Sequence, residues 1–115
     1  MPQTVYKIAT TAEWAAAQAR GNYSGSADDL RDGFVHLSTA AQLGATASRH
    51  FAGRGDLIVA AIDTRRLDAR LKWEPSRGDA LFPHLYGPLP MSSVIWSCAL
   101  SLDTTGRHII PAEVV

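Results

Sequence analysis

The segment Gly33–Thr39, with the sequence GFVHLST, decides how this chain is expected to fold and where it could act. Its apolar first half has the composition of a short strand, and the two hydroxyl residues at its end are typical of a helix N-terminus. Unpaired backbone N–H groups at the start of a helix favour anions, and a histidine beside them adds a proton donor or acceptor. The segment therefore predicts one wall of a pocket for a phosphate-bearing or otherwise anionic small molecule.

Two helices are expected around this segment, each preceded by a capping pattern. Residues 10–13 (TTAE) and 39–42 (TAAQ) both place a threonine three positions before a Glu or Gln, which is the spacing of a capping box. The pattern predicts helices over residues 11–20 and 40–52, each followed by a glycine that suits a helix end.

Short apolar or alternating runs predict the strands. They lie at residues 6–9, 33–38, 57–62, 71–74 and 94–102, with a short edge strand at 108–110. The order strand, helix, strand, helix and then several strands favours an α+β fold, with a curved, mostly antiparallel split sheet and two early helices. The proline-rich stretch 75–91 is expected to form an ordered but irregular loop.

Composition limits the class of protein. The 115 residues are 46% hydrophobic and 19% charged, which indicates a single globular domain over residues 1–115. Eleven basic and eleven acidic residues cancel, so non-specific nucleic-acid binding is not expected. No apolar run reaches the ~20 residues that span a bilayer, and no secretory signal pattern is visible. A lone cysteine, Cys98, fits a reducing compartment and is expected in the core, so a cytoplasmic protein is predicted.

A metal centre is not predicted. The polar stretch 21–32 is expected to be a loop whose Asp28 and Asp29 are solvated, because no third ligand follows at a recognisable spacing. The four histidines likewise share no zinc-binding spacing; they are His36, His50, His84 and His108.

Three residues of the opening segment are candidates for the pocket. His36 is either a half-buried histidine bonded to a carbonyl or a functional imidazole, and the sequence favours neither alternative. One of Ser38 and Thr39 is expected to cap the second helix, which leaves the other hydroxyl free to contact a ligand.

A second group of candidates follows the strand at 71–74. Glu74 is either a surface charge paired with Lys72 or Arg77, or a pocket carboxylate that polarises a ribose hydroxyl or stabilises a developing cation. Arg77 could hold an anion bidentately. His84 and Tyr86 are two positions apart, so an extended backbone would point both to one side, either as a site wall or as part of a loop over the core.

Several blocks of the sequence resemble one known family. They are residues 6–8 (YKI), 33–39 (GFVHLST), 73–75 (WEP) and 82–87 (FPHLYG), together with Trp14 and Gln42. The resemblance covers nearly the whole chain and is to domain of unknown function 952, a family of small, mostly bacterial proteins. It implies a fold similar to that of the ADP-ribosyltransferases, a curved split sheet that cradles NAD and is shared with the RNA 2′-phosphotransferases.

The resemblance also implies roles for individual residues. His36, Ser38 and Thr39 would lie under the nicotinamide ribose, and Glu74 would correspond to the glutamate that steadies the oxocarbenium-like transition state. Lys7 would occupy the first-strand position where such enzymes use arginine or histidine. Lysine can donate to a hydroxyl or phosphate there, but it lacks the planar fork of arginine.

Three functional hypotheses follow. In the first, the candidate residues bind NAD as a substrate, or a related ADP-ribose ligand, and a transferase or glycohydrolase reaction takes place at its N-glycosidic bond. In the second, the same pocket binds a nucleotide or another anion without turnover. In the third, the proline-rich loop serves a homodimer interface.

Overall fold

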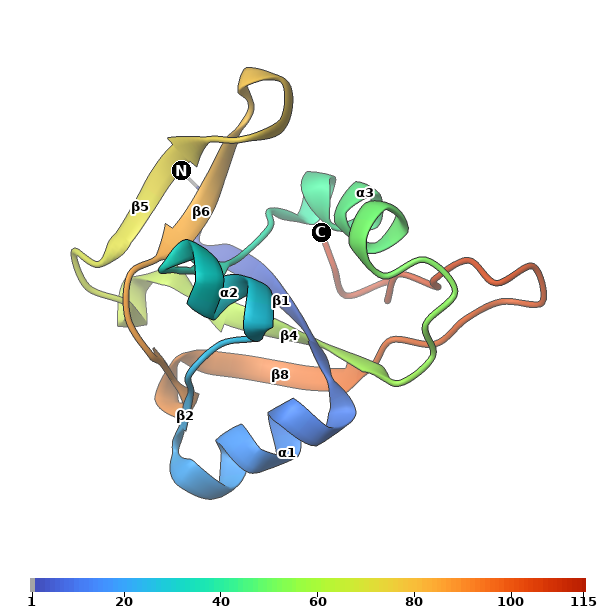
Figure 1. The fold of residues 1–115 in the computed structure, drawn as a ribbon, viewed down its shortest axis with the longest axis horizontal. Helices are drawn as coiled ribbons and strands as arrows, with labels where there is room; N and C mark the ends of the chain where they lie inside the picture. The colour runs from blue at the N-terminus through green and yellow to red at the C-terminus, as the bar shows by residue number, and fades with distance from the viewer. Residues whose placement is uncertain (1) are drawn as a thin grey trace.

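The longest apolar run of the sequence forms the central strand of the main sheet. Strand β4 (Leu57–Asp63) is buried along its whole length, as expected for a strand that is covered on both faces. It pairs antiparallel with β1 (Thr4–Thr10) on one side and with β8 (Val94–Ala99) on the other. The computed structural model describes residues 2–115, except for the side chain of Arg77 (Figure 1).

The other elements build two smaller sheets and three helices. The helices are α1 (Thr11–Arg20), α2 (Ala27–Asp32) and α3 (Ala40–His50), and short 3₁₀ turns are η1 (Thr64–Arg66), η2 (Arg77–Asp79) and η3 (Met91–Ser93). The remaining strands are β2 (Asn22–Tyr23), β3 (Val35–His36), β5 (Leu71–Pro75), β6 (Leu81–Leu85) and β7 (Leu89–Pro90). One small sheet is β2-β7 and the other is β3-β6-β5, and the described pairs between named strands are antiparallel. The prediction of an α+β fold with mostly antiparallel sheets is confirmed.

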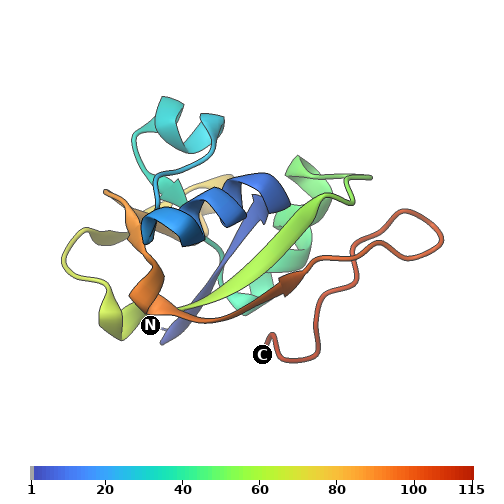
Figure 2. The same cartoon turned by 90° about the horizontal axis from the view of Figure 1, so that it is seen from below.

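The main sheet separates two clusters of buried side chains, because successive residues of a strand point to opposite faces. The α1-side cluster contains Val5, Ala9, Trp14, Ala17, Tyr23, Val35, Leu37, Ile58, Ala60, Ile62, Leu85 and Leu89. The α3-side cluster contains Tyr6, Ile8, Leu43, Ala47, Leu57, Val59, Ala61 and Leu100. Helices α1 and α3 therefore cover opposite faces of the sheet, and Figure 2 shows α1 lying along its own face.

Both predicted capping boxes are present. The Thr10 side chain accepts from the N–H of Glu13, and the Thr39 side chain accepts from the N–H of Gln42. Gly21 ends α1 with a φ of 93°, a conformation that glycine adopts without strain. Helix α3 ends at His50, two residues earlier than predicted.

The prediction of a loop over residues 21–32 was wrong. This stretch contains β2 and the six-residue helix α2, so the described residues 2–115 form three α-helices rather than two early ones. Helix α2 is too short to show an apolar period. Its only sequence signal is a third capping box, in which Ser26 accepts from the N–H of Asp29 and the Asp29 side chain accepts from the N–H of Ser26.

The prediction of an irregular loop over residues 75–91 was also wrong, because β6, β7 and η3 lie there. Proline usually argues against a strand between two neighbours, since it lacks an N–H donor. Pro83 nevertheless lies in β6, between β3 and β5. Its carbonyl accepts from the N–H of Leu37, one residue beyond the end of β3, so the missing donor falls where the pairing with β3 ends.

Two strand predictions were too long. The run at 33–38 contributes only β3, and Ser38 then forms an isolated bridge with Tyr6 of β1. The final strand ends at Ala99, and His108 forms only an isolated bridge with Leu102. Cys98 is exposed rather than buried, and it lies on β8, the edge strand of the main sheet. Within residues 2–115, no helix has the length and apolar character needed to cross a bilayer.

Candidate functional site

A pocket of about 420 Å³ opens between the main sheet and the helices α2 and α3. This volume lies within the ~300–1,000 Å³ that small-molecule sites occupy. The lining residues are Tyr6, Lys7, Ile8, Ser26, Asp28, Asp29, Arg31, Asp32, His36, Leu37, Ser38, Thr46, Arg49, His50, Phe51, Ser76, Phe82 and His84. The pocket thus combines apolar walls with carboxylates, imidazoles and cations.

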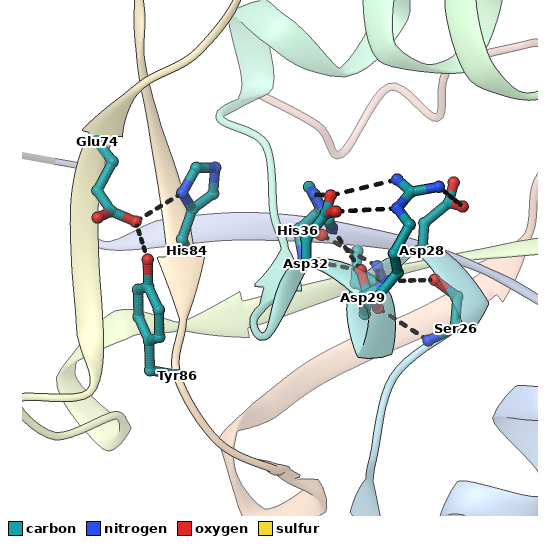
Figure 3. Close-up of polar contacts among 10 residues, drawn as sticks. Ser26, Asp28, Asp29, Asp32, His36, Glu74, His84 and Tyr86 are labelled. Carbon is teal, nitrogen blue, oxygen red and sulfur yellow. Dashed lines mark hydrogen bonds and ion pairs between the residues drawn. The ribbon is translucent and has the colours of Figure 1, made fainter.

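Asp29 is the centre of the polar network on the α2 side (Figure 3). It is only 3% exposed, and its Oδ1 lies 2.6 Å from Nδ1 of His36 and accepts from the backbone N–H of the same residue at 3.1 Å. Its Oδ2 accepts from Nζ of Lys7 and from the N–H of Ser26, both at 2.9 Å. Asp29 therefore fixes the His36 ring, the His36 backbone and the buried Lys7 at once.

The same contacts keep Asp29 ionised. Burial alone would raise the pKa of its carboxyl group. The hydrogen bond with His36, the charge of Lys7 and the hydrogen bonds from Lys7 and Ser26 outweigh this effect, so the pKa lies well below its usual range. The expectation that Asp29 is a solvated loop residue was wrong. The capping pattern that begins at Ser26 was the one available signal, and it does not reveal the contacts with Lys7 and His36.

His36 contacts a second carboxylate on the same helix. Its Nε2 lies 3.0 Å from Oδ2 of Asp32, so the ring lies between two carboxylates. Arg31 holds Asp32 through Nε at 2.9 Å and Asp28 through Nη1 at 3.1 Å. The hydrogen bond from Arg31 is the largest cause of a lowered pKa at Asp32.

The second polar group lies on the β5–β6 hairpin, on the left of Figure 3. Oε1 of Glu74 lies 2.8 Å from Nδ1 of His84 and accepts from the hydroxyl of Tyr86 at 2.7 Å. The hydrogen bonds from Tyr86 and then from His84 lower the pKa of Glu74, and the hydrogen bond to Glu74 raises the pKa of Tyr86. Glu74 thus contacts His84 and Tyr86 in a carboxylate–imidazole pair that the sequence did not specify.

Phe34 joins the two groups. Its ring stacks on His84 with centroids 4.0 Å apart and contacts His36 at 4.6 Å. The two imidazole rings meet edge to face at 5.8 Å. Both histidines line the pocket and Phe34 does not, so Phe34 supports the two rings from behind.

The predicted site residues divide into two sets. Those that line the pocket are Lys7, His36, Ser38 and His84. Outside the lining are Thr39, Glu74, which contacts His84, and Tyr86, which donates to Glu74. Ser38 is buried and its Oγ lies 3.0 Å from the hydroxyl of Thr46, while Thr39 caps α3. The side chain of Arg77 lies outside the described part of the chain.

Helix α3 adds pocket residues that sequence reasoning missed. Arg49 and His50 lie in its last turn and, with Thr46, line the pocket opposite α2. They carry no sequence signal, because an exposed helix face ordinarily has such residues. Among residues 2–115, no group of three or more His, Cys, Asp or Glu side chains is arranged to hold a metal ion.

The fold and the pocket define an α+β protein in which two carboxylate–imidazole pairs meet at one small-molecule-sized cavity. The family model described as "Protein of unknown function (DUF952)" matches residues 8–97. The chain therefore belongs to this family, which confirms the family named from the sequence.

The solved structures that this chain is similar to include the protein CC0527 from Caulobacter crescentus. Its crystal structure is 47% identical in sequence, with 92% of this chain and 93% of that chain covered and a TM-score of 0.88. Its solution NMR structure is 47% identical, with 92% and 91% covered and a TM-score of 0.82. Among curated proteins, no relative matches this chain.

Proposed function

We propose that this protein is an enzyme that binds NAD or an ADP-ribose-type ligand in the pocket and cleaves or transfers its N-glycosidic bond. The observation that carries the proposal is the meeting of two imidazoles, each held through Nδ1 by a carboxylate, at one cavity. Carboxylate-held imidazoles are suited to proton transfer, because the carboxylate fixes the tautomer and the orientation of the ring. The resemblance to the ADP-ribosyltransferases supplies the class of ligand.

The pocket also contains groups that suit a ribose and its phosphates. Ser38 and Arg49 line it. A hydroxyl suits a sugar hydroxyl as partner, and a guanidinium suits a phosphate. Glu74 does not line the pocket, so its role is to hold His84 rather than to touch the ribose directly. A developing positive charge on the sugar would instead lie near the carboxylates of α2, which include Asp32.

Nicotinamide release from NAD tests the proposal. The parent protein is expected to release nicotinamide above the uncatalysed background. Glu74→Gln removes the carboxylate that holds the His84 ring and is expected to lower the rate by about 100-fold, the lower end for loss of acid–base catalysis. His108→Ala and Glu113→Gln are matched controls, because neither residue lines the pocket, and they are expected to keep the parent rate. Equal background release from the parent and Glu74→Gln would contradict the proposal.

A binding module without turnover is the second candidate function. The contacts of Lys7 and His36 favour it. Lys7 is held by Asp29, and His36 lies between Asp29 and Asp32, so both side chains are fixed in position and would bind a ligand without moving. ADP-ribose at 100 times its dissociation constant would then raise the free energy of unfolding by about 2.7 kcal/mol. Thermal stabilisation without any product in mass spectrometry would favour binding over catalysis.

A further inference from the structure

We propose that the two pocket histidines have opposite roles in proton transfer, with His36 as the donor and His84 as the acceptor. The inference rests on the proposed function for the reaction that uses the protons. The protonation of the two rings is a property of the free protein, so it is tested without any substrate.

His36 lies between two carboxylates, one at each ring nitrogen. Its Nδ1 lies 2.6 Å from Oδ1 of Asp29 and its Nε2 lies 3.0 Å from Oδ2 of Asp32. Ionised carboxylates only accept hydrogen bonds, so a neutral ring would leave one lone pair facing a carboxylate oxygen. Only the protonated ring can donate to Asp29 and at the same time form an ion pair with Asp32.

The carboxylates in contact with His36 favour the same protonation, because a nearby negative charge stabilises a cation. These carboxylates are Asp29 and Asp32, which are also held by Lys7 of β1 and Arg31 of α2. The opposite wall of the pocket, on α3, carries Arg49 and His50. The pair of Lys7 and Asp29 is buried, where an unbalanced charge is costly.

His84 is placed as an acceptor. Its ring has one carboxylate contact, from Nδ1 to Glu74, and that oxygen also accepts from Tyr86. A neutral ring with its hydrogen on Nδ1 satisfies this contact and keeps a lone pair on Nε2. His84 is 6% exposed, with Phe34 stacked on one face and His36 at 5.8 Å, so a second imidazolium beside His36 would be repelled.

Together the two rings form a complete proton path. Nε2 of His84 takes the proton of the attacking water or hydroxyl as the new bond to C1′ forms. The old bond to C1′, the ribose carbon of the N-glycosidic bond, breaks, and its electron pair goes to the departing atom. That atom receives the proton from Nε2 of His36, whose contact with Asp32 is replaced by a contact with the ligand.

The path also selects the class of substrate. If the departing atom is uncharged in the substrate, it would leave as an anion unless His36 gives it this proton. The nicotinamide ring of NAD is cationic in the substrate, so it leaves as a neutral molecule and needs no proton. The assignment therefore favours a neutral N- or O-linked ADP-ribosyl group over NAD within the proposed ligand class.

Ring-nitrogen NMR spectra of the ¹⁵N-labelled protein at pH 7 test the assignment. His36 is expected to show two protonated nitrogens, and His84 a protonated Nδ1 with an unprotonated Nε2. Asp32→Asn is expected to move His36 to a neutral pattern and leave His84 unchanged. Glu74→Gln is expected to change the tautomer of His84 alone.

Asp28→Asn is the matched control, because Asp28 lies on the same helix and contacts Arg31 rather than a histidine. It is expected to leave both ring patterns as in the parent. A neutral His36 ring in the parent, or a His84 ring with its hydrogen on Nε2, would overturn the assignment. Neither result depends on nicotinamide release, so this inference and the proposed function can fail separately.

Discussion

Lys7 and Asp29 form an ion pair whose side chains are only 5% and 2% exposed. Removing one partner of such a pair leaves an uncompensated buried charge, which costs about 3–5 kcal/mol. Lys7→Met is therefore expected to lower the free energy of unfolding by about 3 kcal/mol in urea denaturation, since His36 still contacts Asp29. The double variant Lys7→Met/Asp29→Leu removes both charges and is expected to recover part of that loss; a double variant less stable than Lys7→Met would contradict the role given to the charge.

Asp29 also links stability to pH. Its pKa in the folded chain is depressed, because the contacts with His36 and Lys7 outweigh the effect of burial. The stabilisation is therefore fully present above the unfolded pKa of about 3.9 and is lost as the pH falls below it. Between about pH 4 and 2, the free energy of unfolding is expected to fall more steeply for the parent than for Asp29→Asn. Asp28→Asn, an exposed carboxylate on the same helix, should keep the slope of the parent, and equal slopes in all three proteins would refute the linkage.

At the scale of the elements, local signals were predictable and short tertiary elements were not. The boxes that begin at Thr10 and Thr39 depend on residues three positions apart, so the sequence alone placed the starts of α1 and α3. Helix α2 and strand β7 are too short to carry a period. Strand β6 contains Pro83 and exists because β3 and β5 pair with it, which no local pattern reveals.

The cap of α3 gives a prediction at this scale. Thr39 accepts from the N–H of Gln42, so Thr39→Ala is expected to lower the free energy of unfolding by about 1 kcal/mol. Thr39→Ser keeps a capping hydroxyl and is expected to retain most of that stability in urea denaturation. If Thr39→Ala has the stability of the parent but loses affinity for ADP-ribose, the hydroxyl serves the ligand rather than the helix.

At the scale of the whole molecule, the candidate site could be predicted only in part because its residues come from six separate elements, β1, α2, β3, α3, β5 and β6. The sequence identified His36, Glu74, His84 and Tyr86 by residue type and local spacing. It could not pair Glu74 with His84, since this contact depends on the register of β5 and β6. Asp29 was missed because its partners Lys7 and His36 lie 22 and 7 residues away.

The main sheet carries both clusters of the core, so the molecule is expected to unfold as one unit. Leu43 lies in the α3-side cluster and Leu85 in the α1-side cluster, both fully buried. Leu43→Ala and Leu85→Ala are each expected to cost about 2–5 kcal/mol, with one cooperative transition that is the same by tryptophan fluorescence and by circular dichroism. Leu30→Ala is the matched control, because Leu30 is 69% exposed and its loss should change stability by less than about 0.5 kcal/mol. Two separate transitions in either core variant would show that the two clusters unfold independently. The two sides of the pocket, α2 and α3, would then not be held in place by one cooperative unit.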